Sequence, residues 1–242
     1  MNIGVIFAGG VGSRMRSKDK PKQFLEIFGR PIIIHTLEHF ENNADIDAVV
    51  ISCVEEWIDY LRAQIERFGL RKVKKIVAGG NSGQLSIYNG LRAAKEIAGQ
   101  QESIALIHDG VRPLINGKLL SDNIACVKEH GSAITAGIVK ETIVVTDKDG
   151  CVEQVPTRDK SRVAKAPQSF WLSEILEAHE RAMSEGVYDT VDSCTLMHRY
   201  GHKLYMVDGP YDNIKITTPD DYYAMRAILE AKENAQIYGE EE

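Results

Sequence analysis

Glycines and basic residues near the start of the chain form a pattern that can bind phosphate. The apolar run Ile3–Phe7 leads into the glycine-rich segment Gly9–Gly12. Two basic residues, Arg14 and Lys22, follow it. Because glycine has no Cβ, backbone N–H groups in such a loop can approach an anion closely, and two nearby cations indicate a polyphosphate. An ordinary strand-to-helix turn with Arg14 on the surface is the alternative interpretation.

Neither of the two common phosphate-binding motifs fits this loop. A P-loop requires G-x-x-x-x-G-K-[ST], and no Gly-Lys-Ser or Gly-Lys-Thr follows. The dinucleotide fingerprint G-x-G-x-x-G could begin at Gly10, but its last glycine would fall on Met15. A nicotinamide-dependent dehydrogenase is therefore disfavoured.

A turn in the middle of the chain carries a carboxylate that could bind a metal ion. Asp109 and Arg112 lie in the segment His108–Pro113, directly after a predicted strand. Magnesium commonly takes one or two carboxylates together with phosphate oxygens, so Asp109 is a candidate Mg²⁺ ligand. A turn-stabilising ion pair between Asp109 and Arg112 is the alternative. We expect His108 to be structural, because no Ser-His-Asp or Cys-His pattern accompanies it.

A third basic residue, Lys215, lies near the end of the chain. It belongs to the segment Asp212–Pro219, in which Asn213–Thr217 is predicted to be a late strand. Alternation along a strand would place Asn213 and Lys215 on the same face. A lone lysine in a strand is usually a solvated edge residue, which is the alternative to a role in phosphate binding.

Strand and helix patterns alternate along the first half of the chain. Apolar, β-branched runs predict strands at Ile3–Phe7, Ala48–Val54, Lys74–Val77 and Ser103–His108. Apolar residues at helical spacing predict helices at Ile32–Glu41, Glu56–Phe68 and Ser86–Ile97. This order indicates an α/β fold with a doubly wound, mostly parallel, Rossmann-like sheet. Ligands bind beyond the carboxyl ends of such strands, which makes candidate site segments of Ala8–Arg14, Gly79–Ser86 and Asp109–Pro113.

The pattern changes after about Ala136. The runs Glu141–Val145 and Cys151–Val155 flank an Asp-Gly pair, which predicts a hairpin. A polar, basic stretch follows at Pro156–Ala166, and we expect residues 138–166 to form an arm that projects from a single domain spanning residues 1–242. Further helices are predicted at Leu172–Ser184 and Pro219–Glu233, and a further strand at Lys203–Val207.

Composition excludes several classes of protein. The 242 residues carry a net charge of −6, which argues against a broad nucleic-acid surface. The four cysteines include no C-x-x-C pair, which fits a reduced, cytoplasmic protein better than a disulfide framework. No segment approaches the roughly 18 apolar residues of a membrane span, so no membrane partner is expected. The apolar run at the N-terminus stops at Gly9 and lacks a basic flank, so no signal peptide is expected either.

Five segments occur in an order that is typical of one enzyme family. They are Ala8–Met15, Pro21–Phe24, His108–Pro113, Ala166–Phe170 and Asp212–Pro219. Together they resemble the cytidylyltransferases that act on 2-C-methyl-D-erythritol 4-phosphate or ribitol 5-phosphate, and the resemblance runs from about residue 2 to about residue 230. It implies a Mg²⁺-dependent reaction in which CTP and a polyol phosphate give CDP-polyol and pyrophosphate, as in isoprenoid or teichoic acid biosynthesis.

The resemblance also implies roles for individual residues. The implied nucleotide-binding residues are Ala8, Gly9, Gly10, Gly12, Gly80, Asn81, Ser86 and Asp109, with Asp109 beside the metal. The implied catalytic residues are Arg14, Lys22, Arg158 and Lys215, of which the first two contact the CTP phosphates. The implied polyol-phosphate residues are Arg112, Thr142, Arg158, Thr190 and Lys215. In the family Thr142 and Arg158 lie on the arm that reaches the neighbouring subunit, which implies a homodimer with shared sites.

Two questions remain open at this point: which polyol phosphate is the acceptor, and whether the protein catalyses this reaction. The segments Thr217–Pro219 and Pro167–Phe170 resemble the ribitol 5-phosphate branch more closely, whereas Thr190 resembles the methylerythritol branch. We favour ribitol 5-phosphate. The alternatives are a nucleotidyltransferase with another nucleotide or acceptor and a nucleotide-binding regulator without catalysis.

Overall fold

Alternation of side chains along β1 (Asn2–Ala8) divides the apolar core into two layers. Ile6 and Ala8 face one layer, in which helices α1 (Ile32–Asn42), α2 (Ile58–Arg67) and α4 (Gly117–His130) pack. Ile3 and Val5 face the other layer, which contains α3 (Gly83–Ala98), α5 (Leu172–Ser184) and α6 (Ser193–Arg199). Successive side chains of a strand point to opposite faces, so a strand that is apolar throughout requires helices on both sides of its sheet.

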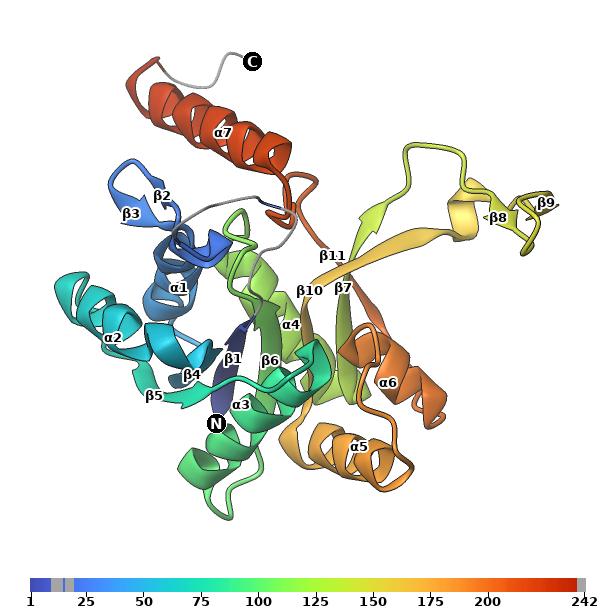
Figure 1. Ribbon diagram of the computed structural model, residues 1–242, viewed down its shortest axis with the longest axis horizontal. Helices are drawn as coiled ribbons and strands as arrows, with labels where there is room; N and C mark the ends of the chain where they lie inside the picture. Colours follow the sequence, from blue (N-terminus) through green and yellow to red (C-terminus); the bar gives the residue numbers. More distant parts are fainter. Residues whose placement is uncertain (10–14, 16–19, 239–242) are drawn as a thin grey trace.

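The computed structural model describes residues 1–9, 15 and 20–238, and within them a seven-stranded sheet lies at the centre (Figure 1). The strand order is β11-β7-β10-β6-β1-β4-β5. The strands besides β1 are β4 (Ala48–Cys53), β5 (Val73–Ala78), β6 (Ile104–Asp109), β7 (Ser132–Ile138), β10 (Arg162–Trp171) and β11 (Met206–Asp208). Only β10 runs antiparallel to its neighbours in this sheet, β6 and β7. The predicted doubly wound, mostly parallel fold is therefore confirmed.

Most predicted elements of the first half are present with small changes at their ends. The helix predicted at Ser86–Ile97 begins earlier, at Gly83, because the Ser82 hydroxyl caps it by accepting the Leu85 N–H at 3.2 Å. The helix predicted at Glu56–Phe68 begins as a 3₁₀ turn, η3 (Glu55–Trp57), before α2. Between β1 and α1 lie the short elements η2 (Lys22–Phe24), β2 (Glu26–Ile27) and β3 (Arg30–Pro31).

The segment Asn213–Thr217 is not a strand, so that prediction was wrong. It belongs to none of the sheets in the described residues. Ile216 fixes it instead, since this fully buried side chain packs with Val111 and Met225 beneath helix α7 (Pro219–Tyr238). The Ile216 N–H also donates to the Val111 carbonyl at 2.9 Å. The segment therefore lies against the turn that follows β6.

The segment between β7 and β10, residues 139–161, projects from the body and ends in a hairpin of β8 (Val145–Thr146) and β9 (Val152–Gln154) (Figure 1). The hairpin was predicted, but its strands are shorter than expected. Asp147 builds the turn: its Oδ1 accepts the N–H groups of Asp149 and Cys151, both at 2.9 Å. The arm returns through the 3₁₀ turn η4 (Arg158–Lys160) into β10.

No helix in the described part of the chain is both long and apolar enough to cross a membrane. The exposed face of α7 illustrates this, because it alternates apolar residues with charged ones such as Arg226, Glu230 and Lys232.

The buried imidazole of His179 on α5 is expected to make stability depend on pH. Neither ring nitrogen has a hydrogen-bond partner among the described residues, and burial lowers the pKa of His179 to about 4. The unfolded chain takes up a proton below its ordinary pKa, so the free energy of unfolding falls by about 2 kcal/mol between roughly pH 7.5 and pH 5 from this group alone. His179→Leu should remove that loss in urea unfolding. Equal losses in the variant and the unchanged protein would contradict the prediction.

Candidate active site

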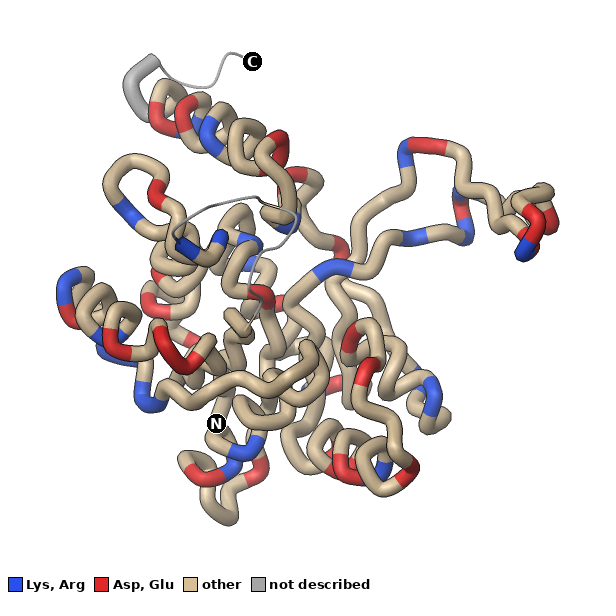
Figure 2. Tube along the Cα trace, viewed as in Figure 1, with Lys and Arg blue, Asp and Glu red and all other residues tan. Residues whose placement is uncertain are grey.

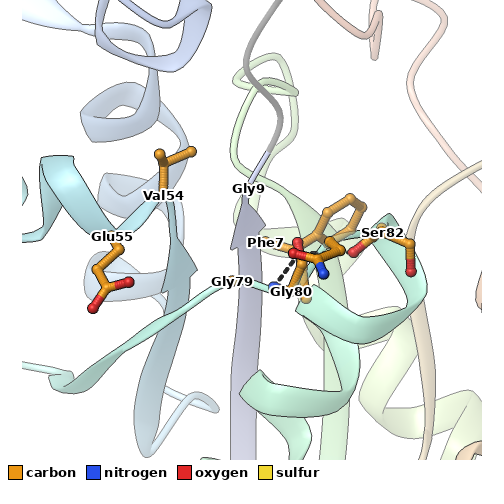
Figure 3. A pocket seen from close by; sticks show the side chains of 10 residues that line it. Phe7, Gly9, Val54, Glu55, Gly79, Gly80 and Ser82 are labelled. Carbon is orange, nitrogen blue, oxygen red and sulfur yellow. Dashed lines mark hydrogen bonds between the residues drawn. The ribbon is translucent and has the colours of Figure 1, made fainter.

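Two pockets that share Phe7 as a lining residue lie at the carboxyl edge of the sheet. The first, called here the glycine-lined pocket, is formed by Phe7, Gly9, Gly79, Gly80, Asn81 and Ser86, with Glu55 at its rim (Figure 3). The second, called here the charged pocket, is formed by Phe7, Asp109, Arg112, Lys165, Asp192 and Lys215. The carboxyl ends of β1, β5 and β6 supply Phe7, Gly79 and Asp109, and a doubly wound sheet is expected to bind its ligand at this edge.

Ser86 holds the wall of the glycine-lined pocket in shape. Its buried hydroxyl accepts the Gly80 N–H at 3.0 Å, the dashed line in Figure 3, and it donates to the Ser82 carbonyl at 2.9 Å. A Cβ on Gly9 would lie 2.7 Å from the same oxygen, so only glycine lets β1 end this close to α3. The Ser86 hydroxyl, which was expected to face the nucleotide, is thus bonded to backbone groups of Gly80 and Ser82. The exposed Asn81 lines the pocket.

The rest of the predicted phosphate loop falls outside the described residues. Gly10, Gly12 and Arg14 are in that part of the chain. Ala8 is described and buried, and its carbonyl accepts the Gln23 side-chain amide at 2.7 Å.

Side-chain contacts of Gln23 and Phe24 hold the Pro21–Phe24 segment beside the end of β1. Gln23 reaches Ala8 as described, and the Phe24 ring stacks on Trp57 with centroids 5.0 Å apart. Gln23 and Phe24 are both buried, whereas Lys22 is partly exposed. Two anchors on the following residues therefore fix the backbone from which the Lys22 ammonium extends.

An ion-pair cluster occupies the charged pocket. The Arg112 Nε donates to Asp109 Oδ2 at 2.8 Å, and the Lys215 Nζ lies 2.6 Å from Oδ1. Burial opposes ionisation of this carboxyl, but the charges of Lys215 and Arg112 outweigh burial and hold the pKa of Asp109 below its usual value. The Lys215 ammonium also lies 5.8 Å from the centroid of the Phe7 ring. The turn-stabilising Asp109–Arg112 pair thus exists, and Lys215 joins it from a distant segment.

Backbone contacts hold the cluster in place. The neutral ring of His108 donates from Nε2 to the Arg112 carbonyl at 3.0 Å, and burial lowers the pKa of His108 to about 4. The Arg112 guanidinium donates to the Asn213 carbonyl at 3.1 Å, and the buried Asn213 amide donates to the Ala166 carbonyl at 2.8 Å. These contacts agree with a structural role for His108 and join three chain segments.

Sequence reasoning missed the residues that hold the loop before α6. Gln168 donates to Asp192 Oδ2 at 2.9 Å and accepts the Cys194 N–H at 2.8 Å. Gln84 accepts both the N–H and the hydroxyl of Thr190, at 2.8 and 2.6 Å. Thr190 is thus positioned next to the charged pocket by α3 rather than by its own neighbours. A buried glutamine carries no local sequence signal, because amide residues are usually exposed.

Thr142 and Arg158 do not join the charged pocket of their own chain. They lie together on the arm, where the Arg158 guanidinium and the Thr142 hydroxyl are 3.5 Å apart. Both line a separate hollow formed by arm residues such as Val139 and Pro156. The predicted polyol-phosphate residues therefore fall into two groups in the described part of the chain. Thr142 and Arg158 lie on the arm, whereas Arg112 and Lys215 line the charged pocket.

The chemistry of the donors fits a magnesium ion that arrives with a nucleotide. No cluster of three or more histidine, cysteine, aspartate or glutamate side chains suited to a metal occurs in residues 1–9, 15 and 20–238. Asp109 supplies carboxylate oxygens in the charged pocket. Magnesium commonly takes one or two protein carboxylates when phosphate oxygens complete its shell, and Asp109 is the residue of this pocket that would hold it.

The fold and the two pockets define the class of this protein as a nucleotidyltransferase of the α/β type. The chain belongs to the 2-C-methyl-D-erythritol 4-phosphate cytidylyltransferase (IspD) family, whose model matches residues 3–231. The crystal structure of 4-diphosphocytidyl-2C-methyl-D-erythritol synthase from Anaerococcus prevotii DSM 20548 superposes with a TM-score of 0.82 at 28% identity, covering 95% of this chain and 96% of that one.

Similar sequences divide between two acceptors. Ribitol-5-phosphate cytidylyltransferase from Streptococcus agalactiae serotype III (strain NEM316) is 55% identical over 99% of this chain and 100% of its own length. The protein of the same description from Vibrio parahaemolyticus serotype O3:K6 is 50% identical, with the same coverage. 2-C-methyl-D-erythritol 4-phosphate cytidylyltransferase from Clostridium acetobutylicum is 38% identical over 95% of this chain and 97% of its own length.

Proposed function

We propose that the protein transfers CMP from CTP to ribitol 5-phosphate, releasing pyrophosphate. The observation that carries the proposal is the cluster of Asp109, Arg112 and Lys215 beside the glycine-lined pocket, with Phe7 lining both pockets. The glycine-lined pocket suits a nucleoside, and the cations of the charged pocket suit phosphate groups. Ribitol 5-phosphate is favoured as acceptor because the relatives at 55% and 50% identity are ribitol-5-phosphate cytidylyltransferases.

The reaction needs fixed charge and positioning more than a covalent nucleophile. A phosphate oxygen of the acceptor forms a bond to the α-phosphorus of CTP, and the bond from that phosphorus to the bridging oxygen breaks. Pyrophosphate leaves with the electron pair, and no proton must move because the attacking group is already an anion. Arg112 and Lys215, held by Asp109, offset the repulsion between the two anions without reorganising during the reaction.

Asp109 is proposed to hold Mg²⁺ against the triphosphate. A bound Mg²⁺ neutralises part of the charge on phosphate oxygens. Asp109 is suited to this role because its pKa is held low and it stays ionised. Its contacts with Arg112 and Lys215 keep the carboxylate in one orientation.

A substrate panel tests the proposal. CTP, UTP and ATP are each combined with ribitol 5-phosphate, methylerythritol phosphate and glycerol phosphate, with and without Mg²⁺, and pyrophosphate release is measured. We expect turnover with CTP and ribitol 5-phosphate that depends on Mg²⁺. CTP binding without pyrophosphate release in any mixture would instead support a regulator, and turnover with another pair would identify a different transferase.

Lys22→Ala is expected to keep the fold and to lose CDP-polyol formation, by roughly 10²–10³-fold in rate if its charge acts on the CTP phosphates. Lys20→Ala is the matched control, since Lys20 is a nearby lysine of the same charge that forms an ion pair with Glu26 at 3.3 Å. Near-normal turnover of the Lys22 variant in a pyrophosphate-release assay would reject the assigned role.

The protein is further proposed to be a cytoplasmic homodimer. The arm exposes large apolar side chains, namely Ile138, Val144, Val152, Val155 and Val163, and basic residues lie on both the outgoing and the returning segment of the arm (Figure 2). Exposed apolar surface on a projecting element is typical of an interface. All four cysteines are free, which suits a reducing compartment.

A further inference from the structure

Lys165 lies in the charged pocket but has no part in the ion-pair cluster. It is on β10, where pairing with β7 runs from Arg162 to Ala164 and resumes only at Gln168. Irregular pairing of this kind re-aims side chains and is common next to active sites. The Lys165 side chain lines the same pocket as Asp109, Arg112 and Lys215.

Space for this side chain depends on a glycine in the neighbouring strand. A Cβ on Gly137 of β7 would lie 2.9 Å from the Lys165 Cε and 3.3 Å from its Nζ. The lysine stem therefore crosses β7 where the strand has no side chain. Its ammonium reaches the Tyr211 carbonyl, to which it donates at 3.1 Å.

Charge distinguishes Lys165 from the other cations of the pocket. Arg112 and Lys215 are both paired with Asp109, and the Asp192 carboxylate accepts from Gln168 and from Thr195. In the described ranges Lys165 makes no ion pair, and its polar partner is the neutral Tyr211 carbonyl. Burial and the charge of Arg112 lower the pKa of Lys165, while Asp212 acts in the opposite direction. A cation kept near another cation in a partly buried pocket is ready to bind an anion.

We propose that Lys165 binds the phosphate group of the polyol phosphate and so sets the affinity for that substrate. This inference rests on the proposed function. Lys165 lines the charged pocket together with Arg112 and Lys215, which are assigned to the polyol phosphate, and does not line the glycine-lined pocket assigned to the nucleoside, so its effect is assigned to the acceptor. The Lys165 ammonium supplies a charge that the Asp109 cluster does not, because Asp109 already offsets part of the charge of Arg112 and Lys215.

A purely structural role for Lys165 makes a different prediction. The Tyr211 ring lies 3.3 Å from the Lys140 Nζ and 5.9 Å from the Lys165 Nζ, so both lysines contact the loop that leads to Lys215. If Lys165 only anchored this loop, its loss would disturb Lys215 and change the rate at saturating substrate. Lys140 is an exposed residue at the base of the arm and does not line the charged pocket, which makes it the matched control.

Steady-state kinetics of Lys165→Met, Lys165→Arg and Lys140→Met test the inference, with CTP and ribitol 5-phosphate varied in turn. Loss of one hydrogen bond to a charged group should raise the KM for ribitol 5-phosphate about 10- to 100-fold in Lys165→Met. The KM for CTP and kcat should stay within about threefold, as should all constants of Lys140→Met. Lys165→Arg, which keeps the charge, should recover most of the affinity.

The outcomes separate this inference from the proposed function. An unchanged KM for ribitol 5-phosphate in Lys165→Met, beside an active unchanged protein, would overturn the inference alone. A fall in kcat with no selective rise in that KM would also overturn it in favour of the anchoring role. If the unchanged protein forms no CDP-polyol from ribitol 5-phosphate or methylerythritol phosphate, the proposed function and this inference both fail. Should Lys165→Met not fold, Lys165→Gln gives the same comparison.

Discussion

Replacing Lys215 by glutamine is expected to lower kcat for CDP-polyol formation by about 10²–10³-fold while leaving the fold intact. The Lys215 Nζ lies 2.6 Å from Asp109 and faces the charged pocket from a segment fixed by the buried Ile216. Its charge acts where negative charge gathers on the reacting phosphate, and such a group contributes more to the transition state than to substrate binding. The measurement is kcat from pyrophosphate release, with circular dichroism to verify folding.

Lys232→Gln is the matched control for this experiment. Lys232 also forms a close ion pair, with Asp212 at 2.7 Å, but it lies on the exposed side of α7. Exposed ion pairs contribute about 0–1 kcal/mol to stability, so this variant should retain both fold and rate. If the Lys215 variant kept the same kcat as the Lys232 variant, the Lys215 charge would have no role in the reaction.

Coexpression of two variants that are each inactive alone is expected to restore activity. Arg158→Ala removes the guanidinium of the arm, and Lys215→Gln removes the ammonium of the charged pocket. If the arm of one subunit completes the site of the other, a mixed dimer has one site with both defects and one site with neither. Random pairing after coexpression then restores about a quarter of full activity, because half of the dimers are mixed and each has one working site.

This result depends on where the structure places Arg158. It contacts Thr142 on the projecting arm and lines a hollow there, away from the Asp109 cluster of its own chain. The readout is pyrophosphate release by the unseparated coexpressed preparation, compared with each variant alone and with a simple mixture of separately purified dimers. Mixed dimers as inactive as their parents would rule out a site shared in this way and would place Arg158 outside the reaction or within its own subunit's site.

The sequence predicted the parts of this protein that depend on neighbouring residues. The strand at Ile3–Phe7, the helix at Leu172–Ser184 and the hairpin in the arm follow from side-chain periodicity and turn residues, which are local properties. Strand β7 (Ser132–Ile138) had no such signal, because its small residues Ser132, Ala133 and Gly137 lack the bulky, branched side chains that indicate a strand. Helix α6 was missed because it spans only seven residues.

Contacts between distant segments were decided by tertiary structure alone. The sequence placed Asp109 and Arg112 together in one turn, but it did not show that Arg112 reaches the Asn213 carbonyl, 101 positions away, or that Lys215 meets Asp109. It also assigned Asn213–Thr217 to a strand, whereas the burial of Ile216 beneath α7 holds this segment in place.

By itself, the sequence determined the type of sheet and the chemistry available at its edge, because periodicity, glycines and charged residues are properties of short segments. Only the tertiary structure decided which charges meet, which pocket Lys165 lines, and that Thr142 and Arg158 lie apart from the Asp109 cluster. The physical reason is that parallel strands bring their carboxyl ends to one edge whatever their distance along the chain, and the register and packing of those strands then choose the neighbours.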